Sequence, residues 1–414
     1  MRPILFFLAA LLTATPLFAT DKADLPSPDG NLVLSVSLKN KQLGYSLARG
    51  ENPLLDWAPL GLTINNTDSG AGLESIEQLG SSGELTRTFP VYGIHAEGKV
   101  KYIEYRIGGL KEGQTLRFRI FNDGVAFRYE FPQGISGRVN SEATAFGIRD
   151  NAVIWTQDGG AALGPCEGAW YPARVADFFV SPDIENADPK ELRKFIRTGP
   201  VLAVLPGNHF LLVQEAGSFG LGWSGLKYAV NNGAPVRAFY YYDRKGFVFP
   251  EKTTATPWRV VLATRSLDAL VNSDIVSSLV LRPDPVLFPE GTATDWCKPG
   301  RATWTWLATG GARYNDQLEF VDFASELGFE YHLVDDGWEK WKSEENLSPW
   351  EMLGKVVERG RQKNVKIWAW KRWEAIRSPD NDWAAMRDFF DKIKTVGVVG
   401  LKIDFMDSDS QERL

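Results

Sequence analysis

The sequence has few of the side chains that bind transition metals or form disulfides. Among 414 residues there are only two cysteines, Cys166 and Cys297, and three histidines, His95, His209 and His332. Two cysteines are too few for a cysteine-based zinc site, so that class of site is excluded by count. An exported protein could join the two cysteines in a disulfide. Two separate thiols are the simpler expectation, because a chain of this length needs no covalent link to fold.

An excess of basic residues and long apolar runs are missing as well. The net charge is −6 and no basic stripe is visible, which argues against a nucleic-acid partner. No stretch approaches the ~20 uninterrupted apolar residues that a membrane-spanning helix requires, so no membrane span is expected.

The N-terminus has the pattern of an export signal. Arg2 supplies a positive start, residues 4–12 (ILFFLAALL) form a short apolar run, and Ala19 ends a small-residue cleavage pattern. We therefore predict a signal peptide over residues 1–19 and a mature protein that is periplasmic or secreted. No cysteine lies near the cleavage position, so a lipid anchor is not expected.

Two common catalytic motifs are absent, and aromatic residues are abundant. There is no G-x-S-x-G nucleophile motif and no glycine-rich phosphate-binding turn. His332 lies inside an apolar strand pattern and is expected to be a hydrogen-bonded core residue. The aromatic share of 12% suits either a large core or a surface on which sugar rings stack, and composition does not decide between them.

Residues 20–281 have the sequence pattern of a β-sheet domain. Residues 32–38 (LVLSVSL) alternate apolar and polar side chains, which is typical of a half-buried strand. Residues 115–121 alternate in the same way, a turn signal follows at residues 122–124 (NDG), and residues 125–131 form the return strand. Many short strands over such a length predict a large β-sandwich.

The pattern of apolar and polar residues changes after residues 282–295. These residues contain three prolines and are predicted to be a linker. Four apolar strands then alternate with helical patterns. Each strand and helix together take roughly 30 residues, which is the repeat length of a parallel (β/α)8 barrel. We predict that residues 296–414 are the first half of such a barrel. A doubly wound open sheet is the competing fold, and it loses support because no glycine-rich phosphate turn is present. The four predicted strands cover residues 302–307, 330–338, 365–373 and 398–405.

Charged and aromatic side chains gather where three of these strands end. In a parallel barrel the carboxyl ends of the strands meet at one rim, where active sites lie. A cleft with carboxylates and aromatic walls suits glycoside chemistry, because negative charge stabilises an oxocarbenium-like transition state. The strand-end residues are Asp335, Asp336, Trp338, Trp370, Lys371, Arg372, Trp373, Asp404 and Asp407.

Several longer motifs, in this order along the chain, resemble glycoside hydrolase family 97. They are SPDGNLVLSVSL, FNDGVAFRYEFP, TPWRVVLATRS, WCKPGRATWTW, YHLVDDGW and GLKIDFMDSDSQE. The resemblance covers essentially the whole mature chain. It implies an N-terminal β-supersandwich joined to a catalytic (β/α)8 barrel, activity on α-glycosides and dependence on Ca2+.

The resemblance also suggests roles for single residues. The sequence K-x-D at residues 402–404 is similar to the fourth barrel strand of retaining α-galactosidases, which makes Asp404 the expected nucleophile. Lys402 is expected to help keep that carboxylate ionised if both side chains point the same way. Four more residues are predicted to contact substrate because they lie at strand ends: Trp306, Asp336, Trp338 and Lys371.

Two residues of the β domain are candidate calcium ligands by the same resemblance. Glu167 lies in a segment, CEGAWYP, that matches the family's calcium-binding segment. Asn122 is a second candidate ligand, although its position in the NDG turn explains it equally well.

These observations predict an exo-acting retaining α-glycoside hydrolase that releases terminal α-galactose with Ca2+ bound. An α-glucosidase of the same family and a non-catalytic carbohydrate-binding remnant are the alternatives. The resemblance places the family's acid/base glutamate on a later barrel strand, beyond Leu414. The chain as given is therefore expected to be truncated and to be inactive alone.

Overall fold

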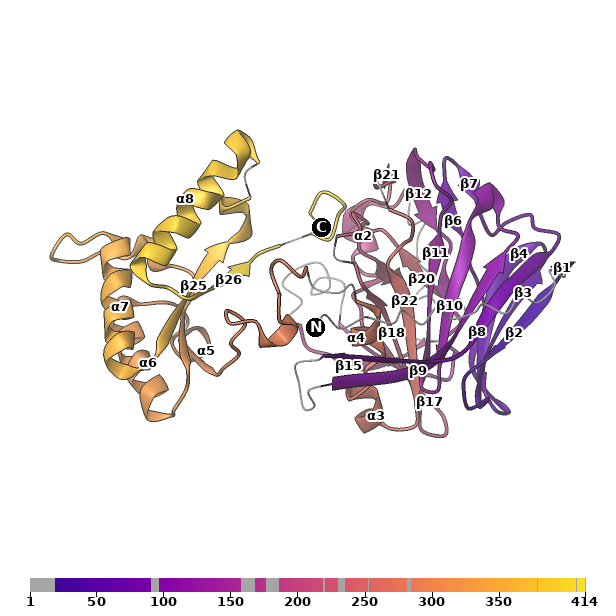
Figure 1. Cartoon of the computed structure of the whole chain (residues 1–414), viewed down its shortest axis with the longest axis horizontal. Coiled ribbons are helices and arrows are strands. Elements are labelled where there is room, and N and C mark those ends of the chain that lie inside the picture. Colours follow the sequence, from indigo (N-terminus) through magenta and orange to yellow (C-terminus); the bar gives the residue numbers. More distant parts are fainter. Residues whose placement is uncertain are drawn as a thin grey trace, which may run out of the picture. The chain divides into compact units, whose positions relative to one another are not determined.

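The computed structural model describes residues 19–90, 97–157, 168–175, 186–218, 220–229, 235–251, 253–280, 284–377, 379–406 and 408–413. These residues form two compact units. The first comprises Met1–Thr292 together with Asp407–Leu414, and the second comprises Ala293–Met406 (Figure 1).

The first unit is built from antiparallel β-sheets. In the described part of the chain, its largest sheet has ten strands in the order β1-β8-β9-β10-β11-β22-β18-β17-β14-β15. The bounds are β1 Ala19–Thr20, β8 Ile76–Pro90, β9 Glu97–Gly108, β10 Thr115–Phe121, β11 Gly124–Glu130, β22 Trp258–Thr264, β18 His209–Ala216, β17 Val201–Leu205, β14 Val153–Thr156 and β15 Tyr171–Arg174.

Among the described residues, three four-stranded sheets complete the β part of this unit. The first contains β2 Lys22–Pro26, β3 Leu32–Lys39, β4 Gln42–Arg49 and β5 Asn52–Pro59; the second β21 Phe247–Val248, β12 Arg138–Glu142, β6 Leu62–Ile64 and β7 Thr67–Asp68; and the third β13 Ala145–Phe146, β20 Val236–Phe239, β19 Lys227–Ala229 and β16 Ile196–Arg197. The short helices are η1 Lys111–Gly113, α2 Pro189–Leu192, α3 Leu267–Val271, α4 Ile275–Leu279 and η3 Gly291–Ala293.

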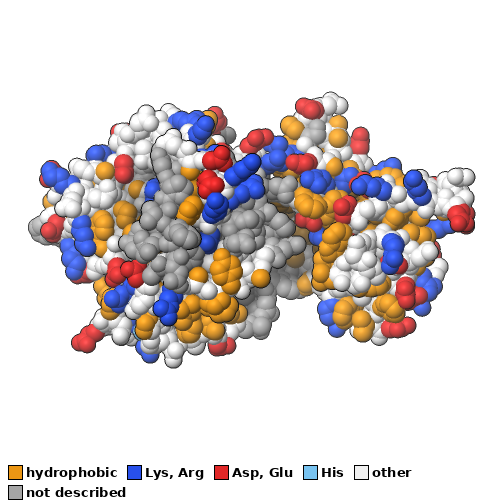
Figure 2. All heavy atoms as spheres, turned by 180° about the vertical axis from the view of Figure 1, so that it is seen from behind, with side chains coloured by type: hydrophobic (Ala, Val, Ile, Leu, Met, Phe, Trp, Pro, Cys, Tyr) orange, Lys and Arg blue, Asp and Glu red, His pale blue; other side chains and the backbone are white. Residues whose placement is uncertain are grey.

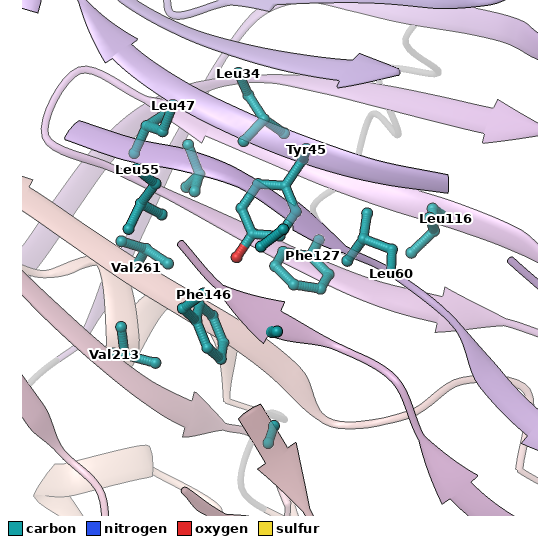
Figure 3. Close-up of a cluster of buried hydrophobic side chains, with 14 of the residues drawn as sticks. Leu34, Tyr45, Leu47, Leu55, Leu60, Leu116, Phe127, Phe146, Val213 and Val261 are labelled. Carbon is teal, nitrogen blue, oxygen red and sulfur yellow. The ribbon is translucent and has the colours of Figure 1, made fainter. Parts of the chain in front are cut away.

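The core of the first unit lies between packed sheets. Tyr45 of β4 faces Phe127 of β11 across the two layers, with ring centroids 5.5 Å apart (Figure 3). Phe146 and Val261 are buried in the same cluster. On β3, buried and half-buried residues alternate as the sequence pattern predicts. Sheets that bury one face against each other make this β-sheet-rich unit a sandwich.

The predicted hairpin is confirmed. Strands β10 and β11 pair antiparallel from Thr115↔Glu130 to Phe121↔Gly124, so Asn122 and Asp123 form the two-residue turn. The neighbouring strand β22 is buried along its whole length, because α3 and α4 cover the face that points away from the sandwich core.

The second unit is a parallel α/β structure. Its four strands pair in the order β23-β24-β25-β26, the same order as in the sequence. The strands are β23 Ala302–Trp304, β24 Tyr331–Val334, β25 Lys366–Arg372 and β26 Gly400–Asp404, and the helices are α5 Trp306–Thr309, α6 Tyr314–Glu326, η4 Trp338–Lys340, α7 Pro349–Lys363, η5 Trp373–Ala375 and α8 Asp380–Val396.

This order is that of successive βα units, and no reversal of strand order, as in a doubly wound sheet, occurs among these four strands. Four strands do not close a barrel. The structure therefore shows a parallel α/β unit, and the (β/α)8 barrel stays a prediction.

Local signals explain where these elements begin and end. Ser348 and Glu351 form a complete capping box at the start of α7. The predicted strand 302–307 is too long, since β23 stops at Trp304 and Trp306 begins α5. His332 is fully buried between Thr303 and Gln317, with ring nitrogens 2.9 Å and 3.1 Å from their side-chain oxygens, so the prediction of a hydrogen-bonded core histidine is confirmed.

None of the helices in the described part of the chain combines the length and apolar character needed to cross a membrane. Figure 2 shows Lys and Arg side chains lying beside Asp and Glu side chains over much of the face seen from behind, so charges of both signs are interspersed there.

Candidate active site

The parallel sheet of the second unit has two different faces. Successive side chains of a strand point to opposite faces, and residues at the same level on parallel neighbours share a face. One face carries Val334, Ile367 and Ala369, which pack with α6 and α7 in the core of this unit. The register pairs Trp370 with Lys402, so these two side chains share the opposite face. The sequence thus places its indoles and charges on the face away from the helices.

Asp335 anchors this polar face. It follows β24 directly, and only 2% of its surface is exposed. Its Oδ2 accepts a hydrogen bond of 2.6 Å from the indole Nε1 of Trp304, on β23. Its Oδ1 lies 3.2 Å from Nζ of Lys402, on β26. A buried carboxylate needs such partners, because an unpaired buried charge is strongly unfavourable.

Lys402 joins two carboxylates. Besides Asp335, its Nζ contacts Oδ2 of Asp404 at 3.1 Å. The ammonium also lies 4.8 Å from the ring centroid of Trp304, within cation–π range. Burial by itself lowers the pKa of Lys402, but the hydrogen bonds and charges of Asp404 and Asp335 raise it above its ordinary value. Lys402 is therefore a fixed positive charge between the two aspartates.

Asp404 ends strand β26 and keeps 37% of its side chain exposed. Its Oδ2 accepts a 3.0 Å hydrogen bond from Nε1 of Trp370, and its Oδ1 accepts a 2.8 Å bond from the backbone N–H of Phe405. Burial alone would raise the pKa of Asp404. The hydrogen bonds from Trp370, Phe405 and Lys402 and the charge of Lys402 outweigh it and hold the pKa below its usual value.

Phe405 fixes the end of the strand. Its φ is +60°, in the left-handed region that side chains other than glycine rarely adopt. The ring meets Trp370 edge-on, with centroids 5.9 Å apart, and the guanidinium of Arg372 lies 4.7 Å from the Phe405 ring centroid. These contacts hold Phe405 so that its N–H points at Asp404.

This arrangement supplies an ionised, partly exposed carboxylate on a rigid strand. Such a group can attack an electrophilic carbon or stabilise a developing cation. Asp335 is buried and paired with a lysine, which suits holding Lys402 in place rather than donating a proton to a substrate.

Two of the residues predicted to contact substrate, Trp338 and Lys371, do not lie on this polar face. Trp338 is fully buried, donates a hydrogen bond of 2.9 Å to the carbonyl of Trp370, and packs on Trp350 in the core. Lys371 lies on the helix-facing side of β25, where its Nζ pairs with Glu339 at 2.7 Å. Both were predicted to contact substrate because they end strands. Side chains alternate along β25, so Lys371 points away from the polar face. Trp338 is too deeply buried to line a pocket.

Trp306 and Asp336 are accessible. Trp306 is 44% exposed at the start of α5. Asp336 follows Asp335, is half-buried, and forms no hydrogen bond or ion pair with the described residues. Their predicted roles as substrate contacts stay predictions. Asp407 lies outside the described residues.

The described residues confirm neither of the two candidate calcium ligands. Oδ1 of Asn122 accepts a 3.1 Å hydrogen bond from the backbone N–H of Asp29, and its carbonyl accepts one of 3.0 Å from the guanidinium of Arg49. A cation next to a guanidinium is unfavourable, so the turn role explains Asn122 and the ligand role does not fit. No group of three or more His, Cys, Asp or Glu with metal-binding geometry occurs in the described part of the chain. Glu167 and Cys166 lie outside it, and Cys297 is half-buried.

Sequence reasoning missed Trp304, and it named Asp335 and Trp370 only as strand-end residues, without giving either a role on this face. The signal was available. If Val334 and Ala369 face the helices, the residue that follows each of them must face the other way. Trp304 was hidden because the first strand was predicted to run on to residue 307.

Comparison with known proteins adds independent information. Residues 25–281 match the profile described as "Glycosyl-hydrolase 97 N-terminal", and residues 295–414 match "Glycoside hydrolase 97". A protein of Streptomyces bingchenggensis named "Probable retaining alpha-galactosidase" is 28% identical over 392 residues, which are 90% of this chain and 55% of that protein. A "Retaining alpha-galactosidase" of Bacteroides thetaiotaomicron is 22% identical over 452 residues, covering 100% of this chain and 64% of that protein.

Solved structures share the fold. A β-arabinopyranosidase structure superimposes with a TM-score of 0.70 at 21% identity, covering 94% of this chain and 63% of that chain. A family 97 enzyme of Pseudoalteromonas in complex with panose gives a TM-score of 0.69 at 18% identity, covering 94% and 59%. The chain thus spans between half and two thirds of the length of these relatives.

Proposed function

Because the chain belongs to glycoside hydrolase family 97, we propose that the complete protein is an exo-acting glycosidase that cleaves terminal α-galactosides with retention of configuration. The single observation that supports this most strongly is the environment of Asp404. Its carboxylate ends a strand, is partly exposed, and is kept ionised by Trp370 and Lys402. A retaining glycosidase needs such a group as its nucleophile.

In the proposed reaction a carboxylate oxygen of Asp404 attacks the anomeric carbon. A bond forms between that oxygen and the carbon, while the bond to the leaving oxygen breaks. The leaving oxygen takes a proton from an acid that we place outside the described residues. Water then attacks the glycosyl ester, gives up its proton to the same group acting as a base, and releases Asp404. Lys402 and Trp370 hold the aspartate ionised before the attack.

Galactose is the proposed sugar because both curated relatives are named α-galactosidases. β-L-Arabinopyranose is a second candidate, since its ring has the same configuration as α-D-galactose without the exocyclic carbon and a β-arabinopyranosidase shares the fold. An α-glucosidase is the third candidate, given the family 97 structure with panose. Rates on aryl α-galactoside, β-L-arabinopyranoside and α-glucoside separate the three. A clear preference for glucoside would refute the galactose assignment.

The decisive experiment replaces Asp404 by glycine in the longest reading frame that contains this chain. We expect Asp404→Gly to abolish hydrolysis of natural α-glycosides. Added azide should restore cleavage of an activated aryl α-glycoside and yield the β-glycosyl azide, because azide occupies the space of the missing nucleophile. An α-configured azide product, or undiminished hydrolysis, would show that Asp404 is not the nucleophile. A parent protein that binds galactosides without cleaving them would favour a carbohydrate-binding role.

Three further parts complete the proposal; the first two rest on family membership and the third on the sequence pattern of the N-terminus. The parallel unit is the first half of a (β/α)8 barrel, in which the face with Lys402 and Asp404 points inward. Ca2+ binds through Glu167, without Asn122. Residues 1–19 direct the protein to the periplasm or to the medium.

A further inference from the structure

A pocket in the sandwich unit has no part in the proposed reaction. It lies where helix α4 packs against strand β9, beside the turn that joins β10 and β11 (Figure 1). Its volume is about 330 Å³, at the small end of the ~300–1,000 Å³ usual for small-molecule sites. All of its lining residues belong to the sandwich unit and to the described part of the chain. The pocket is therefore formed within one unit.

Hydrogen bonds hold the walls of this pocket together. The backbone N–H of Lys99, on β9, donates to Oδ2 of Asp274 at 3.1 Å, which joins the strand to the start of α4. The hydroxyl of Ser273 donates to Oδ2 of Asp123 at 3.1 Å, which joins the loop before α4 to the hairpin turn. Because these bonds connect three separate elements, the pocket is preformed, as ligand sites usually are.

Part of the lining is apolar. Three of the lining side chains are buried in the cluster that α3 and α4 cover: Val100, Phe121 and Ile275. Ala269 of α3 adds an exposed methyl group. A ligand that carries both C–H and O–H groups, such as a sugar ring, can use this apolar lining and the polar walls at once.

The polar part of the lining carries charges of both signs. Asp123 and Asp274 lie in the same pocket as Lys99 and Lys101. A ligand with a net charge of either sign therefore meets like charges there. A hydroxyl group avoids this conflict, because it can donate to a carboxylate and accept from an ammonium group.

Asp123 offers an acceptor to such a ligand. It forms no ion pair with the described residues, and its hydrogen bond from Ser273 engages Oδ2. Burial raises the pKa of Asp123, and the hydrogen bond from Ser273 and the charge of Arg49 oppose this only in part. A hydroxyl donor on a neutral ligand would stabilise the ionised carboxylate without bringing a second charge into the pocket.

We propose that this pocket, lined by Lys99, Asp123, Asn272 and Asp274, is a non-catalytic binding site for a neutral sugar. Hydroxyl groups of the sugar bond to the two carboxylates and to the side-chain oxygen of Asn272, and its C–H groups face the apolar lining. The site goes beyond the proposed reaction and uses none of the residues that take part in it.

The first test locates a bound sugar. Hydrogen exchange of the backbone amides is measured on the full chain, with and without D-galactose, D-glucose or L-arabinose. Each sugar is added at about 50 mM, well above the Kd on the order of 1 mM expected for so small a ligand. We expect exchange in residues 97–102 and 268–276 to slow about threefold or more with at least one sugar, because a ligand that binds the closed form opposes local opening. No slowing with any of the three would overturn the proposal.

The second test fills the pocket. Ala269→Trp places a ring there without removing a side-chain hydrogen bond, and Asp123→Asn removes a charged acceptor. We expect the sugar concentration that gives half-maximal protection of residues 97–102 to rise about tenfold in both variants. Leu267→Trp is the matched control, since Leu267 is 50% exposed on the same helix and does not line the pocket. It should bind as the parent does.

Two outcomes of the second test would overturn the proposal. Equal affinity in Ala269→Trp and the parent would mean that the sugar binds elsewhere. Tighter binding of D-glucosamine or D-glucuronate than of every neutral sugar would show that the pocket selects a charged ligand.

Discussion

The indole of Trp370 donates a 3.0 Å hydrogen bond to Oδ2 of Asp404, across the neighbouring strands β25 and β26. Trp370 itself is 4% exposed and therefore cannot turn away easily. A buried indole that points its single donor at a strand-end carboxylate fixes one oxygen of that group in space. It also favours the charged form, since it can only donate.

Replacing Trp370 by phenylalanine should lower kcat/KM by about tenfold, because a hydrogen bond to a charged group contributes ~1.5–3 kcal/mol and part of that orientation is lost. The ring volume is largely kept, so the unfolding free energy should change less than in Trp370→Ala. Steady-state kinetics and urea denaturation of both variants check this. Equal activity of Trp370→Phe and the parent would contradict a role for the indole N–H.

Removing the charge of Lys402 should raise the pKa of Asp404, which the lysine helps to hold below its ordinary value. The acidic limb of the kcat/KM profile should therefore move to higher pH in Lys402→Met. The matched control is Lys371→Met, because Lys371 pairs with Glu339 and lies on the other face of the sheet. That variant should leave the acidic limb in place. A limb that does not move in Lys402→Met would show that another group controls it.

Breaking the buried pair of Glu142 and Arg259 should destabilise the sandwich strongly. Their side chains are 0% and 1% exposed, and Nε of Arg259 donates to Oε1 of Glu142 at 2.8 Å. Glu142→Leu leaves a buried guanidinium unpaired and should cost about 3–5 kcal/mol of unfolding free energy. The double variant Glu142→Leu/Arg259→Met should regain most of that loss. Denaturation in urea measures both.

An exposed pair serves as the control for this stability effect. Glu84 and Lys101 are each about half exposed, so Glu84→Gln should change the unfolding free energy by less than about 1 kcal/mol. A loss in Glu142→Leu no larger than in Glu84→Gln would contradict the prediction.

Glu215 should make the sandwich less stable as the pH rises. Burial, followed by the charges of Glu142 and Asp409, raises its pKa from 4.5 to about 7, although Arg259 and the N–H of Leu226 oppose the shift. The folded state then holds a proton that the unfolded state has lost. The contribution of Glu215 is fully present below about pH 4.5 and disappears as the pH rises through 7, with a range of at most about 3 kcal/mol.

The variant Glu215→Gln isolates this effect, because it mimics the protonated side chain at every pH. Urea denaturation between about pH 4 and 8 should give a difference between variant and parent that grows with pH. Parallel curves for the two proteins would mean that Glu215 ionises at its ordinary pKa in the folded protein.

Calcium affinity should depend on Glu167. Hard carboxylate oxygens suit Ca2+, and the described residues supply no alternative cluster of acidic ligands. Calorimetric titration of the complete protein should show a clear loss of affinity in Glu167→Gln, while Asn122→Ala should bind as the parent does. Equal affinity in Glu167→Gln and the parent would remove this residue from the site.

Much of the architecture was predictable because it depends on local patterns. The NDG turn at residues 122–124 and the capping box at Ser348 place a hairpin and a helix by short-range hydrogen bonds alone. The apolar run before Asp404 identifies both a strand and its charged end. Each of these features is encoded within a few residues.

The parts of the site that depend on partner strands were less predictable. A strand-end position does not say which face a side chain takes, so Lys371 was placed with Lys402 although it points to the helices. The Asp335–Lys402 contact joins residues 67 positions apart, and neither segment contains a local pattern that predicts the contact. The Lys227–Asp409 ion pair is of the same kind, because its two residues also lie far apart in the sequence.

The place of β22 in the large sheet has a consequence for biosynthesis. This strand lies between β11 and β18, and its Leu262 pairs with Gly124, which is made well over a hundred residues earlier. While the ribosome adds those residues, β11 has a partner on one side only, and its open edge carries Val125 and Phe127. Such an edge can pair with other nascent chains. The sheet can close only after residue 264 has emerged, so a shorter N-terminal segment cannot complete it.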